Sequence, residues 1–152
     1  MLSYEDIFSR VLNKIDDPKE LQLNDDDLLE IYTQRLHSVI SKPFIRRLFS
    51  SIKMDDEIQE LTYSLVDTVD EDSDQEFVTE LFAMGIAIEW LEPKVKSILN
   101  TAKFFGGKEE KKLKDDYSLN KQMLKEMKIE QQKFIRDYGF AFKPYTKTNA
   151  SE

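Results

Sequence analysis

Carboxylates are the most numerous side chains in this sequence that can do chemistry. Asp67, Asp70, Asp72, Asp74 and Glu76 have some of the oxygen spacing that calcium favours, but the run lacks the glycine and the distal glutamate of an EF-hand loop. Either a divalent ion binds here, or the run is a negatively charged loop that leads into a helix N-terminus. The second arrangement is simpler, and we expect no metal site.

The other residue types that form catalytic and cofactor sites are scarce. Cysteine is absent, which excludes disulfides, thiolate nucleophiles and cysteine metal sites. The single histidine, His37, has no histidine or cysteine companion and is expected to be a partly exposed structural residue. Gly106-Gly107 lacks the Lys-Ser/Thr that follows the glycines of a phosphate-binding loop. We therefore expect a protein that is not an enzyme and that needs no cofactor.

Charge is distributed unevenly along the chain, whose net charge is −8. This acidic balance argues against a general nucleic-acid binder, because neutralising phosphates requires a basic face. Residues 55–76 contain ten carboxylates and no basic residue, whereas residues 94–136 contain twelve Lys or Arg. Such a chain is suited to head-to-tail or ring-like self-association through complementary patches. Alternatively, both segments are ordinary solvated faces.

Length and composition predict one mainly helical domain. The chain has 152 residues, enough for one core, and only four Gly and four Pro, too few for the many tight turns of a sandwich or barrel. It has no run of 18 apolar residues and no basic, apolar signal segment at its start. We expect no membrane association and a location in the cytoplasm of the cell that makes the protein.

The first half of the chain predicts two amphipathic helices followed by an ambiguous stretch. Apolar residues at helical spacing occupy residues 4–15, which end at Asp16-Asp17-Pro18, and residues 28–40, which follow a capping Asn24. In residues 44–69 the apolar pattern fits either a strand or a helix. Its β-branched and aromatic content favours a short β-hairpin near residues 49–66.

The strongest apolar run predicts a central core helix at about residues 74–91, around which a helical bundle forms. Ser73 and Glu76 have the spacing of a capping box, so the helix is expected to begin there. Gly85 is expected to allow close approach of another helix, which compensates for its low helix propensity. Pro93 predicts an interruption or kink, after which a short helix ends near Asn100-Thr101.

The last third predicts a long polar helix at residues 108–138 and an extended arm at residues 139–152. The helix has a heptad seam with polar intruders at Asn120 and Gln131, which suits one partner helix in the same subunit or another. We divide the chain into a helical core domain, residues 1–107, and a helix with an arm, residues 108–152, that docks on a partner. Deleting residues 138–152 is then expected to leave the fold intact and to abolish assembly.

Aromatic and apolar side chains of this region are the predicted partner-binding residues. Phe104 and Phe105 beside the glycine pair either dock into a neighbouring groove or cap the chain's own core. The complete predicted set is Phe104, Phe105, Leu113, Tyr117, Leu124, Met127, Phe134, Tyr138, Phe140, Phe142 and Tyr145.

Four segments carry a resemblance to a known family. They are Met-Leu-Ser-Tyr-Glu-Asp-Ile-Phe at residues 1–8, Asp-Asp-Asp-Leu-Leu-Glu-Ile-Tyr at residues 25–32, the core run at residues 82–93, and Lys-Ser-Ile-Leu-Asn-Thr at residues 96–101 leading to Phe-Phe-Gly-Gly. Their order resembles that of the small head-to-tail connector (adaptor or neck) proteins of tailed bacteriophages and related prophages. The segments span about the first two-thirds of the chain, and none is a catalytic signature.

The resemblance implies a helical adaptor that forms a ring, commonly twelve-fold, beneath the portal. Its long helix or C-terminal arm would dock on the portal protein, and the ring would continue the DNA channel toward neighbouring neck or tail proteins. DNA would be passing cargo, and the protein would reside in the neck of the virion after assembly in the host cytoplasm. We expect Asp67, Asp70, Glu71 and Asp72 to line the channel, because like charges repel phosphate.

Two other function classes remain open from the sequence. One is a cytoplasmic assembly chaperone or regulatory binder that acts through a C-terminal coiled coil. The other is a small enzyme or metal-dependent nuclease that uses the acidic cluster, whose activity would be lost on EDTA treatment and in Asp70→Ala or Asp72→Ala variants.

Overall fold

The computed structural model describes residues 1–102, 104 and 106–142. The protein is mainly helical with a small three-stranded antiparallel sheet, which confirms the predicted fold class. The elements in chain order are β1 (Leu2–Ser3), α1 (Tyr4–Leu12), α2 (Pro18–Leu21), α3 (Asp25–Ser41), α4 (Pro43–Arg46), β2 (Phe49–Asp55), β3 (Glu60–Leu65), α5 (Glu71–Ala102) and α6 (Gly107–Phe142).

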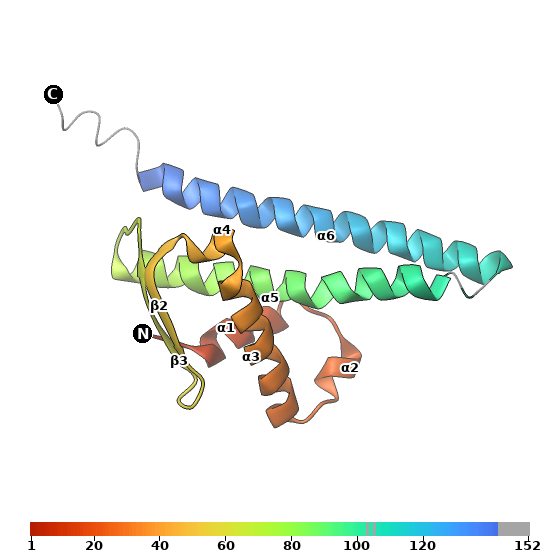
Figure 1. Cartoon of the computed structure of the whole chain (residues 1–152), viewed down its shortest axis with the longest axis horizontal. Coiled ribbons are helices and arrows are strands. Elements are labelled where there is room, and N and C mark those ends of the chain that lie inside the picture. Colours follow the sequence, from red (N-terminus) through yellow and green to blue (C-terminus); the bar gives the residue numbers. More distant parts are fainter. Residues whose placement is uncertain (103, 105, 143–152) are drawn as a thin grey trace.

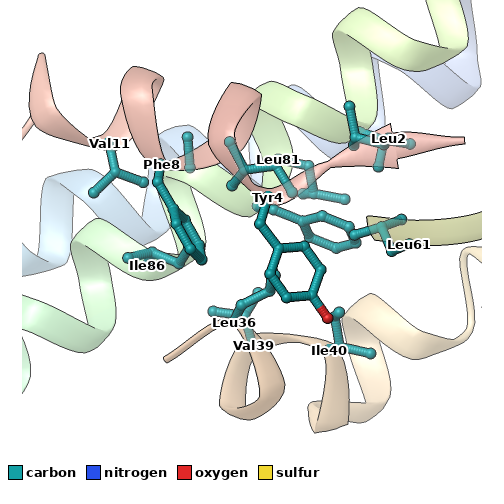
Figure 2. Packing of buried hydrophobic residues seen from close by; sticks show 14 of the residues in the cluster. Leu2, Tyr4, Phe8, Val11, Leu36, Val39, Ile40, Leu61, Leu81 and Ile86 are labelled. Atoms are coloured by element: carbon teal, nitrogen blue, oxygen red, sulfur yellow. The ribbon is translucent and has the colours of Figure 1, made fainter. Parts of the chain in front are cut away.

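Helix α5 is the centre of the molecule. Its residues are buried almost all round the helix between Phe77 and Leu91, as the apolar run predicts. The N-terminal helices α1 and α3 pack against it, and α6 runs antiparallel to it along the other side (Figure 1). Figure 2 shows side chains from β1, α1, α3, β3 and α5 meeting in one core, with Tyr4, Phe8 and Leu81 at its centre.

The two predicted N-terminal helices are α1 and α3, and both begin at side-chain caps. The Ser3 hydroxyl accepts a hydrogen bond from the Asp6 N–H at 3.2 Å, and Asn24 Oδ1 accepts one from the Asp27 N–H at 2.8 Å. These bonds satisfy amide groups that the first helical turn leaves without partners. The Asn24 cap is the one that the sequence predicted.

Strands β2 and β3 form the predicted hairpin, with Gln59 in its turn at a φ of 56°. Strand β1 adds to the other edge of β3, so the sheet order is β1-β3-β2. Leu61 of β3 lies opposite Leu2 on one side and Met54 on the other. The two-residue β1 was not predicted, because its pairing depends on contact with residues almost sixty positions away.

The start of α5 differs from the sequence prediction, since Asp70 and not Ser73 provides the cap. The Asp70 carboxylate accepts hydrogen bonds from the Ser73 N–H at 2.7 Å and from the Ser73 hydroxyl at 2.9 Å. Ser73 is therefore a donor inside the first turn, and Glu76 pairs with Arg10 of α1 at 2.5 Å. The proposed capping box is wrong because a carboxylate three residues upstream competes for the same amide.

Of the interruption or kink predicted at Pro93, the interruption is wrong, because α5 continues through the proline to Ala102. Proline removes one N–H donor, which costs about 3 kcal/mol in an isolated helix. Packing on both sides of the proline offsets this cost: Leu91 and Val95 are buried, and Glu92 pairs with Lys128 of α6 at 2.8 Å. Helix α6 likewise extends past the predicted boundary to Phe142, so residues 139–142 belong to the helix. Residues 143–152 lie outside the described part of the chain.

Candidate docking surfaces

The seam between α5 and α6 is anchored by stacked aromatic rings. Phe77 of α5 stacks on Phe134 with ring centroids 5.1 Å apart and on Tyr138 with centroids 4.0 Å apart. Such pairs add about 0.5–1.5 kcal/mol beyond the apolar area that they bury. Phe134 and Tyr138 were predicted to bind a partner, and the structure places both against the chain's own central helix.

A polar contact reinforces this anchor at the C-terminal end of α6. The Tyr138 hydroxyl donates a hydrogen bond to Asp74 Oδ1, which also accepts one from the Val69 N–H at 3.0 Å. Asp74 is buried, at 8% exposure. Burial and the neighbouring Asp74 charge raise the pKa of the Tyr138 hydroxyl above its usual value, so it stays protonated and can donate. Asp74 thus joins the start of α5 to the C-terminal part of α6.

Gly85 allows α3 and α6 to approach α5 closely in the molecule's centre. A Cβ atom at this position would lie 2.5 Å from Val39 Cγ1 of α3 and 3.3 Å from Gln131 Nε2 of α6. Gln131, a predicted polar intruder in the seam, is 4% exposed. A pocket of about 190 Å³ lies beside these residues, and the ion pairs Lys42–Glu89 and Lys128–Glu92, each 2.8 Å long, cross its edges.

The remaining residues of the predicted heptad seam lie on the side of α6 that faces α5. Leu113, Tyr117, Leu124 and Met127 are half-buried, and Met127 packs against the hydrophobic core. The side chain of Asn120 donates to the Asp116 carbonyl at 2.8 Å within α6. The helix that packs along this seam is α5 of the same chain, one of the two arrangements that the heptad pattern left open.

The other predicted partner-binding residues are at the two ends of α6. Phe104, in the connection between α5 and α6, is 88% exposed. Phe105 and Tyr145 lie outside the described residues. The backbone of Phe140 and Phe142 belongs to α6, but their side chains also lie outside the described part.

The four predicted channel residues gather where the loop after β3 enters α5. Glu71 and Asp72 are exposed in the first helical turn, Asp70 caps it, and Asp67 is half-buried in the preceding loop. Hydrogen bonds from the Ser73 N–H and hydroxyl hold the pKa of Asp70 below its usual value. Within the described residues no group of three or more Asp, Glu or His side chains is arranged to hold a metal ion.

Sequence reasoning missed a surface of α6 that lies beside its seam with α5, which we call the α6 groove. It is a hollow of about 600 Å³ lined by Tyr117, Ser118, Lys121, Gln122, Leu124, Lys125, Lys128, Ile129 and Gln132. Ile129 is 56% exposed there, and the three lysines follow at spacings of four and three. That spacing places them on one helix face, a signal that was present in the sequence beside the heptad seam.

A second missed surface, the α1–α3 hollow, lies on the N-terminal helices. It has a volume of about 390 Å³ and is lined by Glu5, Phe8, Ser9, Leu12, Asp25, Asp26, Leu28, Leu29, Tyr32 and Gln59. Leu12 is 42% exposed. Three separate segments form this hollow, so no local pattern in the sequence indicates it.

His37 belongs to a third cluster, at the turn of the β-hairpin. Its Nε2 lies 2.8 Å from Asp56 Oδ2, and the Tyr4 hydroxyl donates to Asp56 Oδ1 at 2.5 Å. The hydrogen bond from Tyr4 is the main reason why the pKa of the Asp56 carboxyl is lowered, and the contact with His37 is the second. Burial raises the pKa of the Tyr4 hydroxyl. The cluster ties the hairpin turn to α1 and α3.

Comparisons with protein-family models, with curated proteins and with solved structures find no match to this chain. Among the described residues, every helix is too short or too polar to cross a lipid bilayer.

Proposed function

We propose that the chain is a structural subunit of the head-to-tail connector of a tailed bacteriophage. In this proposal it forms a ring below the portal, continues the DNA channel toward the tail and resides in the neck of the virion. The order of the four resembling segments suggests the family. The structural observation that supports it best is α6, a 36-residue helix that packs on its own chain along one seam and exposes the rest of its circumference.

An exposed helix of this length suits a subunit whose partners are other proteins. Its outer side combines exposed apolar residues, such as Leu119 at 71% exposure, with many lysines. Scattered apolar residues are normal on a surface, but a hollow lined by both kinds of side chain offers a place for a partner to bind. In the proposed ring this side of α6 faces another subunit or the portal.

The acidic end of α5 suits a channel wall. Asp70, Glu71 and Asp72 are exposed, and no basic residue occurs between residues 55 and 76. A wall of like charge repels the phosphates of DNA, which allows the duplex to slide without binding. We propose these residues, with Asp67, as the channel lining.

The experiment is electron microscopy and light scattering of the purified chain, alone and mixed with candidate portal protein. The proposal expects ring-shaped particles that bind coaxially to the portal. A chain that stays monomeric in both samples and binds no portal protein contradicts it.

The same experiment separates the connector from an assembly chaperone that acts through a C-terminal coiled coil. A chaperone would give a monomer or dimer and would be absent from finished particles. Because the heptad seam already packs on α5, a coiled coil with another protein would have to displace α6 from Phe77. That rearrangement would expose the core, and the connector needs no such step.

A further inference from the structure

We propose that the α6 groove of one copy docks onto the α1–α3 hollow of a second copy. The inference rests on the proposed function, since it gives the subunit contact of the ring. It follows from the shape and charge of two surfaces that the chain itself leaves uncovered.

The α6 groove is basic with an apolar centre. Lys121, Lys125 and Lys128 line it with Leu124 and Ile129, and no carboxylate is among its described lining residues. Lys121 and Lys125 are exposed and form no ion pair with any described residue. Lys121 Nζ also lies 5.7 Å from the centroid of the Tyr117 ring, a contact that leaves its charge without a carboxylate partner.

The α1–α3 hollow has the opposite character. Glu5, Asp25 and Asp26 line it with Leu12 and other apolar side chains, and its described lining contains no Lys or Arg. Glu5 lies in the first turn of α1 and the two aspartates in the first turn of α3, where helix dipoles favour them. Because none of the three pairs with a described basic residue, each can also accept a lysine from another copy.

The two surfaces cannot meet within one chain. Helix α6 runs along α5, while the parts of α1 and α3 that line the hollow lie away from α6, below α5 in the view of Figure 1. A contact between them joins different patches of two copies, so it is heterologous, and its repetition closes a ring or extends a filament. The contact thus has the geometry that a ring subunit requires.

The apolar centres and the charged edges have different roles in such a contact. Removing the exposed leucine and isoleucine surface from water favours association. The opposite charges select the register and the partner surface, and salt weakens their attraction. Self-association is therefore expected to decrease as the salt concentration rises.

The test is a charge exchange between the two surfaces, read by analytical ultracentrifugation of the full chain. Lys121→Glu/Lys125→Glu makes both surfaces of a copy acidic, and Asp25→Lys/Asp26→Lys makes both basic. Each variant alone is expected to self-associate at least tenfold more weakly than the wild type. An equimolar mixture of the two is expected to regain association, because alternating copies again present opposite charges at every contact.

Matched variants control for folding and for total charge. Lys108→Glu/Lys112→Glu makes the same charge change on another side of α6 and is expected to associate like the wild type. Asp25→Asn/Asp26→Asn removes two of the hollow's three carboxylate charges without placing a cation at the N-terminus of α3. This variant is expected to weaken association while the helical circular dichroism is unchanged.

Several outcomes overturn the docking contact. One is a wild-type protein that stays monomeric by itself at high concentration. Another is normal self-association of the two charge-exchange variants, or an equally weak association of the Lys108→Glu/Lys112→Glu control. The last is an equimolar mixture of the two charge-exchange variants that does not regain association. A loss of duplex-DNA binding in Lys121→Glu/Lys125→Glu, with unchanged self-association, would assign the groove to nucleic acid instead. In each case rings formed with portal protein would still support the connector, so the two proposals fail separately.

Discussion

At the scale of single residues, Asp17 is a buried carboxylate with several polar partners. It is 6% exposed, and its Oδ2 accepts a hydrogen bond from the Trp90 indole N–H at 2.9 Å and lies 2.7 Å from Lys94 Nζ. These two contacts hold the pKa of the Asp17 carboxyl well below its usual range, and the contact with Lys94 has the larger effect. A carboxylate in the loop after α1 thereby fixes the second half of α5.

Replacing this carboxylate has an effect that depends on pH. Asp17→Asn is expected to lower the free energy of unfolding by about 1–3 kcal/mol at pH 7, because hydrogen bonds to a charged group are lost. A depressed pKa contributes stability that is fully present above the unfolded pKa of about 4, and that contribution is lost progressively as pH falls from there through the lower pKa of the folded state. Urea unfolding at pH 7 and pH 3 should therefore show a smaller difference between variant and wild type at pH 3.

The exposed neighbour Asp16 provides the control for this prediction. Asp16→Asn removes the same charge from the same loop and is expected to change the free energy of unfolding by less than about 0.5 kcal/mol at either pH. Equal effects of the two substitutions would contradict a specific role for Asp17.

Gly85 gives a second prediction at this scale. Gly85→Ala is expected to destabilise the protein by about 1–3 kcal/mol, because the added Cβ would lie 2.5 Å and 2.9 Å from the two methyl groups of the fully buried Val39. Gly139→Ala, also within a helix, meets no atom within 4 Å and is expected to stabilise by about 0.5–1 kcal/mol. Thermal melts of both variants measure these changes in stability. A Gly85→Ala protein as stable as the wild type would show that the helices can move apart.

At the scale of elements, the α5–α6 hairpin determines which part of the C-terminus is structural. Tyr138 stacks on Phe77 and bonds to the buried Asp74, so the last turns of α6 contribute to the core. A truncation that removes Tyr138 is therefore expected to affect the fold, whereas a truncation that begins after α6 is not.

Deleting residues 138–152 is expected to lower the free energy of unfolding by roughly 2–4 kcal/mol, from the lost ring stack and the buried carboxylate left with fewer donors. Deleting residues 143–152 keeps every described contact and is expected to leave stability unchanged. Chemical denaturation measures both truncations. If the longer deletion were as stable as the shorter one, α6 would not be anchored by Tyr138.

Contacts between elements also explain why Pro93 does not end α5. Leu91 and Val95 are buried on either side of the proline, and Lys128 of α6 lies against Glu92. Helix stability in proteins comes mainly from tertiary packing. A local rule about one missing N–H donor is overridden because α5 is packed on either side of the proline and is paired with α6 there.

At the scale of the whole molecule, the two hollows of opposite charge lie on different elements. The carboxylates of the α1–α3 hollow belong to the N-terminal helices, while the lysines of the α6 groove belong to α6. With α5 between them, these surfaces are presented to different neighbours (Figure 1). This arrangement is the physical basis of both the proposed ring and the proposed subunit contact.

The sequence by itself determined the elements whose stability is local. The periodic apolar positions of α1 and α3, the Asn24 cap, the hairpin of β2 and β3 and the apolar run of α5 were all predictable, because each is set by residues a few positions apart. The lysine row of α6 was equally present in the sequence and was overlooked in favour of the heptad seam.

Only the tertiary structure decided which surfaces of those elements are covered. Whether the seam of α6 packs on α5 or on another subunit, and where Tyr138 and Asp74 meet, depend on residues far apart in the sequence, 64 positions in the case of Tyr138 and Asp74. The α1–α3 hollow exists only after three segments have folded together. Burial and long-range pairing are properties of the assembled core, so a pattern within one segment cannot specify them.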